Sequence, residues 1–426
     1  MIVNEKMIIH KIISLYSNKK LCLLMIFLFS IITQTIFLCI LIQTTHQINQ
    51  SSDYTKFYEP VAENILNGRG IVERGGNLAI RRPPGYPIIL STIFGLADFL
   101  GLDRVTLIIV FNIITTAVCC IIIFLIAESI FNRRIALMAS LIWITYPFNL
   151  WIIKQPNSEV PFLLFLYLGF LGFLLFIKKR YSIFTLISGI LFGISALIRP
   201  TSVLIGFLCA VVLLFYTEFP KMKRIYSAIL LICGFLFTIL PWEIKILSSI
   251  GHLIFISAGG PPSIRDGLTF AVTPGEGGDQ INVPEDVMAL MKRIRANRTE
   301  LRTTANILKF LQQEIRDNPW PVLKLLGLKV CRSWYGTDEM WYEKYTRIIQ
   351  IFYITLGFIG IILCIRIYKE RLRFICLLLI MIVYFWGMTT LVLSILRYMI
   401  PAMGFIIIFS AITADYLLIR WRQMRN

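Results

Sequence analysis

Ten long apolar stretches, most of them free of charged residues, are the feature that most constrains how this chain can fold. A helix needs about 20 mostly apolar residues to cross the hydrocarbon core of a membrane. The stretches cover residues 21–42, 105–127, 135–151, 160–177, 182–198, 201–216, 225–241, 347–365, 374–394 and 398–419. Because a spanning segment must satisfy its backbone hydrogen bonds internally, we predict an all-α integral membrane protein with about ten transmembrane helices.

The composition excludes several classes of protein. Of the 426 residues, 57% are hydrophobic and 15% are charged, whereas soluble domains usually have about 25% charged residues. An ordinary soluble enzyme and a disordered chain are therefore excluded. Eight of the nine cysteines lie in apolar stretches and only Cys331 lies in a long polar segment, so we expect no intrachain disulfide framework. The first apolar stretch is too long for a signal peptide, and we expect it to be retained.

The net charge of +18 is concentrated on one side of this threading. The segments on the side of the two termini contain 19 Lys and Arg against four Asp and Glu, whereas residues 44–104 contain six of each sign. The positive-inside rule therefore predicts cytoplasmic termini and an exterior 44–104 loop. Residues 86–101 are apolar but interrupted by Gly95 and Asp98, and we expect an interfacial or re-entrant helix there. The positive charge reflects the orientation of the chain in the membrane, and no nucleic-acid partner is expected.

Two exterior segments are longer than the 12–15 residues or so of an ordinary connection. We expect residues 1–241 to form an N-terminal transmembrane module that includes the 44–104 loop, residues 242–346 to form an exterior domain on the periplasmic side, and residues 347–426 to form C-terminal transmembrane helices. Helical patterns in the second exterior segment cover residues 284–295, 299–317 and 320–334. The last of them alternates apolar and basic faces, which predicts a helix lying on the membrane surface.

The first exterior loop carries the densest unusual features. Apolar residues at helical spacing predict a short amphipathic helix: Tyr58, Val61, Ala62, Ile65 and Leu66. Gly68 follows where a C-terminal helix cap is expected, and residues 70–80 suggest a small hairpin about Gly75 and Gly76. The loop thus places an interfacial helix beside a tight turn.

Two adjacent arginines follow this hairpin. Arg81 and Arg82 precede Pro83 and Pro84, and a proline restricts the residue before it to extended geometry. Arginine binds phosphate through two parallel hydrogen bonds, so two fixed cations suit a phosphate ligand. Lipid head-group anchoring is the competing explanation for both arginines. Asp53 lies in the same loop, and there the competing explanation is a solvated helix cap.

Four more ionisable residues are placed at or near outer helix ends, where a charge costs little to insert: Lys154, Glu159, Arg199 and Arg397. Snorkelling to the interface or mutual pairing would explain them. They fall, however, on the same predicted side as Asp53, Arg81 and Arg82. A shared outward cavity of carboxylates and arginines is the simplest functional interpretation.

The order of these motifs resembles a known family, the bacterial members of the protein-mannosyltransferase and aminoarabinose-transferase superfamily of C-type membrane glycosyltransferases. The resemblance extends from about residue 53 to 415 and is strongest in residues 53–87. It is carried by Asp53, Tyr58, Ala62, Gly68, Gly70 and the run Arg82-Pro83-Pro84-Gly85-Tyr86-Pro87, then by Tyr146-Pro147, Ser158-Glu159, Leu197-Ile198-Arg199-Pro200, Pro241-Trp242, Arg397-Tyr398 and Pro401.

The resemblance implies an inverting transfer of a sugar from a polyprenyl-phosphate donor, such as an undecaprenyl-phosphate sugar, to a lipid, glycan or protein acceptor at the outer face of a bacterial inner membrane. It implies that Asp53 is the base and that Glu159 orients the acceptor, assists Asp53 or helps to hold a divalent ion. The resemblance also implies that the donor phosphate is bound by Arg81, Arg82, Arg397 and Tyr398. It implies that the substrates are positioned by Tyr58, Tyr86, Lys154 and Arg199. The identity of the sugar, the identity of the acceptor and a need for metal stay open.

Three other functions fit a polytopic membrane chain. A transporter or flippase for lipid-linked saccharides also places charges in spans, but such proteins usually have repeated halves with broken midplane helices, and no repeat is visible here. An oligosaccharide polymerase or ligase also uses outward loops and arginines. A structural or assembly protein without chemistry is the third. Replacing Asp53 separates these classes, because only the glycosyltransferase needs its carboxylate for transfer.

Overall fold

The computed structural model describes residues 18–45, 53–270, 283–337, 340 and 342–425, and this part of the chain is almost entirely helical. The helices are α2 (Lys19–Thr45), the π-helix η1 (Tyr54–Tyr58), α3 (Glu59–Leu66), α4 (Gly85–Leu100), α5 (Arg104–Ile130), α6 (Arg133–Thr145), α7 (Pro147–Ile152), α8 (Glu159–Lys179), α9 (Ile183–Ile198), η2 (Pro200–Ser202), α10 (Ile205–Phe215), α11 (Lys221–Ile250), α12 (Gly260–Gly267), α13 (Glu285–Ala296), α14 (Thr304–Asp317), α15 (Pro319–Arg332), α16 (Glu343–Ile367), η4 (Lys369–Arg371), α17 (Leu372–Leu391), η5 (Leu396–Tyr398) and α18 (Ile400–Arg425). The predicted all-α membrane fold is confirmed.

Seven helices in the described residues are long and apolar enough to cross a membrane: α2, α5, α8, α11, α16, α17 and α18. The predicted count of ten is therefore not confirmed, because three of the predicted spans are shorter. The predicted span 135–151 is divided into α6 and α7, since Pro147 holds Tyr146 in an extended conformation with ψ of 117°. The other two, α9 and α10, have 16 and 11 residues and meet at the Pro200 turn.

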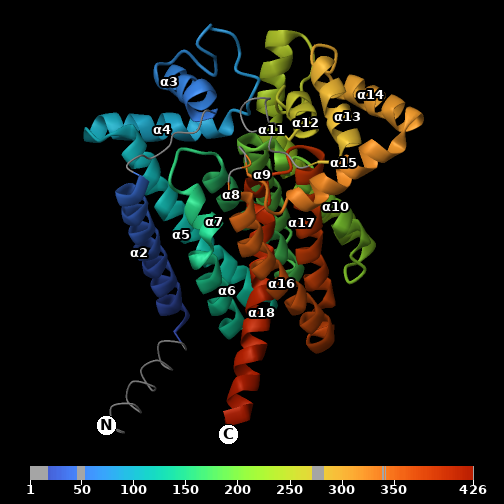
Figure 1. The fold of residues 1–426 in the computed structure, drawn as a ribbon. Coiled ribbons are helices and arrows are strands. Elements are labelled where there is room, and N and C mark those ends of the chain that lie inside the picture. Colours follow the sequence, from blue (N-terminus) through green and yellow to red (C-terminus); the bar gives the residue numbers. More distant parts are fainter. Residues whose placement is uncertain (1–17, 46–52, 271–282, 338–339, 341, 426) are drawn as a thin grey trace.

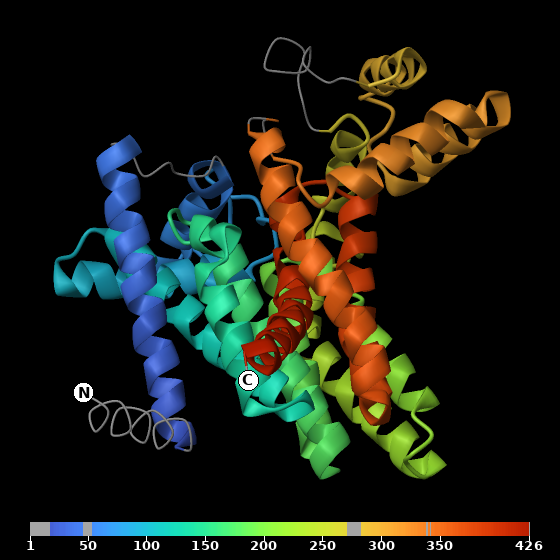
Figure 2. The ribbon, with the colours of Figure 1, turned by 60° about the horizontal axis from the view of Figure 1, so that its bottom comes forward.

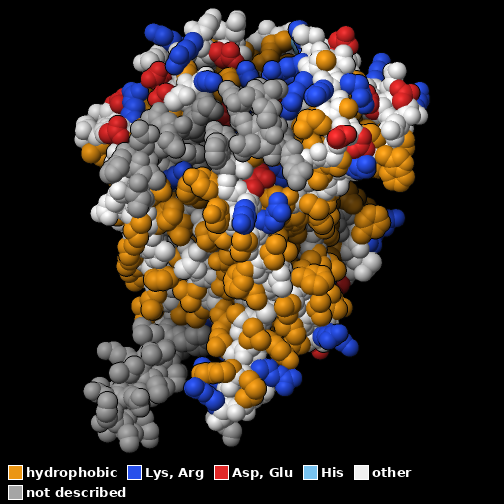
Figure 3. Space-filling view, in the orientation of Figure 1, with side chains coloured by type: hydrophobic (Ala, Val, Ile, Leu, Met, Phe, Trp, Pro, Cys, Tyr) orange, Lys and Arg blue, Asp and Glu red, His pale blue; other side chains and the backbone are white. Residues whose placement is uncertain are grey.

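The long helices form one bundle, and the short loop helices gather at one end of it (Figure 1). We call this end, formed by residues 53–104, 251–270, 283–337, 340 and 342, the loop end. At the opposite end of the bundle, ion pairs connect neighbouring helices. Lys19 at the start of α2 contacts Glu128, and Arg134 contacts Asp415 of α18. Hydrophobic side chains cover the middle of the face in Figure 3, with charged groups above and Lys and Arg below. The predicted cytoplasmic placement of residues 1–17 lies outside the described residues.

Helix α4 lies across the loop end instead of running parallel to the long helices (Figure 1). It ends at Gly101, whose left-handed φ of 65° stops the helix before Asp103 caps α5 by accepting from the Thr106 amide. Arg104 pairs with Asp98 across this corner. The transverse direction agrees with the expected interfacial helix and not with an additional span.

Small residues allow the bundle helices to approach closely. A side chain at Gly189 of α9 would collide with the backbone of Leu231 in α11, and Gly234 of α11 faces the backbone of Leu186 in the same way. Close backbone contact through small residues is the usual basis of helix association in membranes. Pro241 lies inside α11, which continues past the predicted boundary at residue 241. The resulting core places the ends of α8, α9 and α17 next to one another at the loop end.

The second exterior segment has its own small hydrophobic core. Figures 1 and 2 show α13, α14 and α15 projecting sideways from the loop end. The base of α15 is held to the bundle by Lys329, which donates to the carbonyls of Gly267 and Val392, and by Arg332, which donates to the carbonyl of Ser394. The predicted helices at 284–295, 299–317 and 320–334 correspond to these three helices.

The first exterior loop folds as its pattern predicts. Helix α3 ends near Gly68, which has a φ of 73°, and the Arg69 amide donates to the carbonyl of Asn64. Val72 and Leu78 form the single β-bridge of the described chain, on either side of the predicted turn. The loop is therefore ordered around the segment that carries Arg81 and Arg82.

Candidate functional site

A cavity of about 240 Å³ opens at the loop end of the bundle. Its walls come from the first exterior loop, the α7–α8 connection, the α9–α10 turn, the start of α12, the end of α17 and η5. The lining residues are Asp53, Tyr58, Arg82, Pro83, Asn157, Ser158, Glu159, Ile198, Arg199, Pro200, Thr201, Val203, Ser257, Gly259, Gly260, Ser263, Ile264, Met388, Val392, Arg397 and Tyr398. The structure thus brings seven of the ten sequence-predicted site residues to one place.

Asp53 and Arg82 form the ion pair at one wall of this cavity. The Arg82 Nη2 atom donates to Asp53 Oδ1 at 2.9 Å, and both side chains are about a quarter exposed. Arg82 Nε is buried and has no hydrogen-bond partner among the described residues.

The arginines of the cavity keep Asp53 ionised. Burial raises the pKa of the Asp53 carboxyl, but the charges of Arg82, Arg397 and Arg199 outweigh burial and hold this pKa below its ordinary value. Burial lowers the pKa of Arg82, and the Asp53 charge more than compensates, so this pKa lies above its ordinary value. At neutral pH the cavity wall therefore presents a carboxylate and a guanidinium side by side.

Glu159 forms a second and more deeply buried cluster with two arginines. Arg199 Nη1 lies 2.6 Å from Glu159 Oε1 and also donates to Ser158 Oγ at 3.1 Å. Arg397 Nε lies 3.7 Å from the same Glu159 oxygen. Glu159 sits at the first residue of α8, and Arg199 directly follows α9, so the helix ends place these charges. The cluster carries one net positive charge next to the Asp53–Arg82 pair.

Aromatic rings support the cationic side of the cavity. The guanidinium carbons of Arg199 and Arg397 lie 4.7 and 5.4 Å from the centre of the Tyr398 ring. Cation–π contacts of this length favour a fixed position of the guanidinium. Three arginines against two carboxylates leave the cavity with a net positive charge, which suits an anion such as a phosphate.

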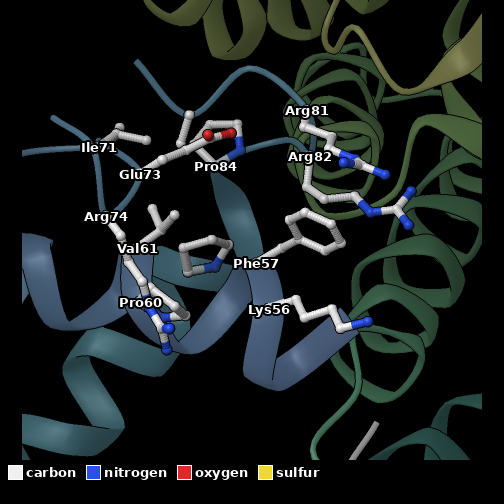
Figure 4. Close-up of a pocket in the computed structure, with 13 residues that line it drawn as sticks. Lys56, Phe57, Pro60, Val61, Ile71, Glu73, Arg74, Arg81, Arg82 and Pro84 are labelled. Carbon is white, nitrogen blue, oxygen red and sulfur yellow. The ribbon is translucent and has the colours of Figure 1, made fainter. Parts of the chain in front are cut away.

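Three predicted site residues lie elsewhere. Tyr86 is buried and packs edge-to-face on Tyr58, with ring centres 4.9 Å apart, so it supports the wall without lining the cavity. Lys154 lies over the Trp151 ring at 3.4 Å, and burial lowers its pKa to about 8. Arg81 turns to a neighbouring pocket, shown in Figure 4. Tyr86, Lys154 and Arg81 therefore do not line this cavity, and their expected contacts with the substrates stay predictions.

Sequence reasoning missed the part of the site that comes from the second exterior segment. The Ala258 amide donates to the carbonyl of Ile80, which brings Gly259 against the backbone of Arg81. A side chain at Gly259 would lie 2.5 Å from the Arg81 carbonyl oxygen. The Gly259-Gly260-Pro261 run was the available signal, since adjacent glycines permit close backbone approach.

The residues present do not form a strong metal site. No group of three or more His, Cys, Asp or Glu side chains clusters anywhere in the described part of the chain. The two carboxylates of the cavity, Asp53 and Glu159, are each engaged by an arginine. Divalent ions prefer several unpaired oxygen ligands, so the donor set does not fit a resident ion and no step is assigned to one.

Residues 81–244, which are less than half of the chain, match the family model described as dolichyl-phosphate-mannose-protein mannosyltransferase. No curated protein sequence matches the chain. The family model covers Arg82, Glu159 and Arg199 and ends within α11. The match confirms the predicted resemblance to membrane glycosyltransferases of the mannosyltransferase type.

The fold is similar to that of the Archaeoglobus fulgidus oligosaccharyltransferase. For the apo crystal structure the TM-score is 0.60 at 12% identity, with 96% of this chain and 52% of that chain covered. For the archaeal oligosaccharyltransferase AglB from the same organism, in complex with an inhibitory peptide and a dolichol-phosphate, the TM-score is 0.58 at 12% identity, with 96% of this chain and 51% of that chain covered. This chain thus spans about half the length of those proteins. At this identity the likeness establishes a common membrane fold.

Proposed function

We propose that this protein transfers a sugar from a polyprenyl-phosphate donor to an acceptor hydroxyl at the outer face of a membrane, with inversion at the anomeric carbon. The convergence of Asp53, Arg82, Glu159, Arg199 and Arg397 on one cavity carries this proposal. The family match to a dolichyl-phosphate-mannose enzyme and the common fold with a protein that binds dolichol-phosphate support a lipid-linked donor.

The cavity provides both parts that a polyprenyl-phosphate donor needs. Arginines supply charge-assisted hydrogen bonds for the phosphate. Met388 and Val392 at the end of α17 supply an apolar wall from which an isoprenoid chain can enter the bilayer. The donor phosphate therefore belongs beside Arg82, Arg199 and Arg397, with its lipid chain directed along the bundle.

The reaction is a single displacement. The acceptor oxygen forms a bond to the anomeric carbon while the bond from that carbon to the phosphate oxygen breaks. The Asp53 carboxylate takes the acceptor proton as general base. The electron pair of the broken bond stays on the leaving polyprenyl phosphate, whose extra charge is stabilised by Arg82 and its neighbours. Attack opposite the leaving group inverts the configuration.

The Asp53–Arg82 pair links donor binding to the activation of the base. A donor phosphate competes with the Asp53 carboxylate for the Arg82 guanidinium. When the phosphate takes up hydrogen bonds from Arg82, Asp53 loses part of the attraction that lowers its pKa, and its basicity rises. Asp53 is thus a stronger base in the donor complex than in the free protein.

Glu159 acts in this proposal as a positioning residue. Its carboxylate holds Arg199 at 2.6 Å and lies 3.7 Å from Arg397, so it fixes two of the three cations that face the donor. It is almost fully buried and already paired, which leaves little capacity for a second base.

A transfer assay with protein in nanodiscs tests this function. Polyprenyl-phosphate hexoses and pentoses carrying a radiolabel are supplied with a membrane-extract acceptor pool, and wild type is compared with Asp53→Asn. The matched control is Asp98→Asn, which removes an exposed carboxylate paired with Arg104 outside the cavity. We expect label transfer by wild type and the control, and none by Asp53→Asn, which still binds donor. Equal transfer by Asp53→Asn, or donor movement without transfer, contradicts the proposal and favours a transporter.

A further inference from the structure

The pocket beside the donor cavity has the composition of an anion site. It measures about 160 Å³, and its lining includes Lys56, Arg74, Arg81 and Arg82 with Glu73 as its one carboxylate. Arg82 lines both spaces and is the wall between them. In Figure 4 the charged ends of Lys56, Arg81 and Arg82 extend to the same side of the Phe57 ring.

The cations of this pocket lack counter-ions. Arg82 pairs with Asp53, but no described carboxylate lies within ion-pair distance of Lys56, Arg74 or Arg81. Like charges gathered on one surface repel one another, so the cluster becomes favourable when an anion lies among them. The net charge of the lining is +3, from four cations and one carboxylate.

The arginines of the pocket are held in place before any ligand arrives. The Arg81 guanidinium carbon lies 4.4 Å from the centre of the Phe57 ring, and that of Arg82 lies 5.7 Å from it. The backbone of Arg81 is packed against Gly259, and Pro83 restricts the backbone of Arg82, the residue directly before it. Preorganised cations bind an anion with less loss of conformational entropy than mobile ones.

The shape of the pocket indicates a sugar-sized ligand on the water side. A site for one water needs about 10–15 Å³, so this pocket is far larger than a single small ion requires. Its floor is apolar and buried, at Val61 and Pro84 among others, and offers a surface for a sugar face. All 13 lining residues come from residues 56–87, and no long helix of the bundle contributes. The lining residues therefore include no helix of the bundle along which a polyprenyl chain could run into the membrane.

We infer that this pocket is the acceptor subsite and that the acceptor carries a phosphate or carboxylate on a sugar near its reacting hydroxyl. This inference rests on the proposed function, because it names the second substrate of the same reaction. Lys56 and Arg81, whose charged ends extend to the same side of the Phe57 ring in Figure 4, bind the anionic group, while the hydroxyl reaches Asp53 past Arg82. Arg81 thus serves the acceptor and not the donor phosphate.

Binding to the protein in phosphatidylcholine nanodiscs tests the inference without any transfer reaction. The probes are methyl glucoside 6-phosphate, methyl glucuronide, uncharged methyl glucoside and inorganic phosphate, each titrated by calorimetry at two salt concentrations. The variants are Lys56→Gln/Arg81→Gln and, as a matched control, Arg69→Gln, which removes an exposed cation of the same loop that lines neither space.

The two charged sugars are expected to bind at least tenfold more tightly than methyl glucoside, which corresponds to about 1.4 kcal/mol. Lys56→Gln/Arg81→Gln should lose at least this tenfold preference, and Arg69→Gln should stay within twofold of wild type. The double variant should still bind polyprenyl phosphate, because Arg82, Arg199 and Arg397 are unchanged. Retained donor binding together with lost sugar-phosphate binding separates the acceptor subsite from the donor site.

Four outcomes overturn the inference. Equal binding of charged and uncharged sugars would show that the pocket is not an anion site. Unchanged binding of the charged sugars by the double variant would show the same. Inorganic phosphate binding as tightly as the sugar phosphate shows a site for a free anion only. Displacement of the sugar phosphate by phosphatidylglycerol in the nanodisc assigns the pocket to a lipid head group. A protein that binds the charged sugars here but transfers nothing would contradict the proposed function and leave the anion site standing.

Discussion

Removing the charge of Glu159 should destabilise the protein through the arginines it holds. Its side chain is 7% exposed and that of Arg199 is 10% exposed, so both charges are almost fully desolvated. Loss of one partner of a buried ion pair costs about 3–5 kcal/mol. Glu159→Gln keeps an oxygen that accepts from Arg199, and Arg397 is partly exposed, so we expect the lower end, about 3 kcal/mol.

The measurement is a double-mutant cycle on the purified protein, with unfolding followed by temperature and denaturant. Glu159→Gln/Arg199→Gln leaves no unpaired charge in this pair, so the double variant should be less destabilised than the sum of the single variants, by about 2 kcal/mol. The control Asp98→Asn breaks a largely exposed pair with Arg104 and should leave the stability close to that of wild type. Additive effects of Glu159→Gln and Arg199→Gln would refute the assigned coupling.

Three further predictions concern other parts of the molecule. Arg82→Gln should move the acid limb of kcat/KM to higher pH, because the pKa of Asp53 then returns toward its ordinary value; an unchanged limb would exclude Asp53 as the titrating base. Burial lowers the pKa of Lys329 to about 7, so between pH 7 and about 10 the unfolded chain binds more protons there and stability rises with pH. Lys329→Met should remove that rise in melting temperature, and an identical pH profile would contradict it. Spin labels placed at Trp320 and Leu323, two exposed positions of α15, should be accessible to oxygen more than to a water-soluble relaxation agent if this helix lies on the bilayer; the reverse would place α15 in water.

The fold class follows from the sequence because hydrophobic length is a local property. Runs such as 160–177 contain enough apolar residues to span a bilayer whatever their neighbours are. The number of full spans depends on local breaks and on packing. Pro147 divides one predicted span, whereas Pro241 does not interrupt α11, and a single sequence does not distinguish these two outcomes.

The charged residues of the cavity can be predicted as a group because the sequence places them on the same side of the membrane. Asp53, Glu159, Arg199 and Arg397 were placed on one side by the positive-inside rule, and the structure brings them together. Their chemical roles remain predictions. The positive-inside rule does not say which residues on one side of the membrane lie close together. It therefore predicts Lys154 on the same side as the cavity residues, although Lys154 packs on Trp151.

The contribution of the second exterior segment could not be predicted. Gly259 reaches Arg81 through a backbone contact between segments about 180 residues apart, and such contacts leave no periodic pattern in the sequence. The division of Arg81 and Arg82 between two spaces is equally a property of the folded loop. Adjacent residues with the same charge look equivalent until the backbone direction is known.

The central claim is that Asp53 activates the acceptor hydroxyl while Arg82 stabilises the leaving phosphate, and single-turnover transfer tests this claim most directly. Donor binding and the rate of the chemical step are measured separately for wild type, Asp53→Asn and Arg82→Gln. General-base catalysis is worth about 10²–10⁴ in rate, so Asp53→Asn should slow the step at least a hundredfold. Donor binding should be retained or become tighter, because no carboxylate then competes with the phosphate for Arg82. Arg82→Gln should weaken donor binding at least tenfold. An Asp53→Asn protein that transfers at the wild-type rate would contradict the account.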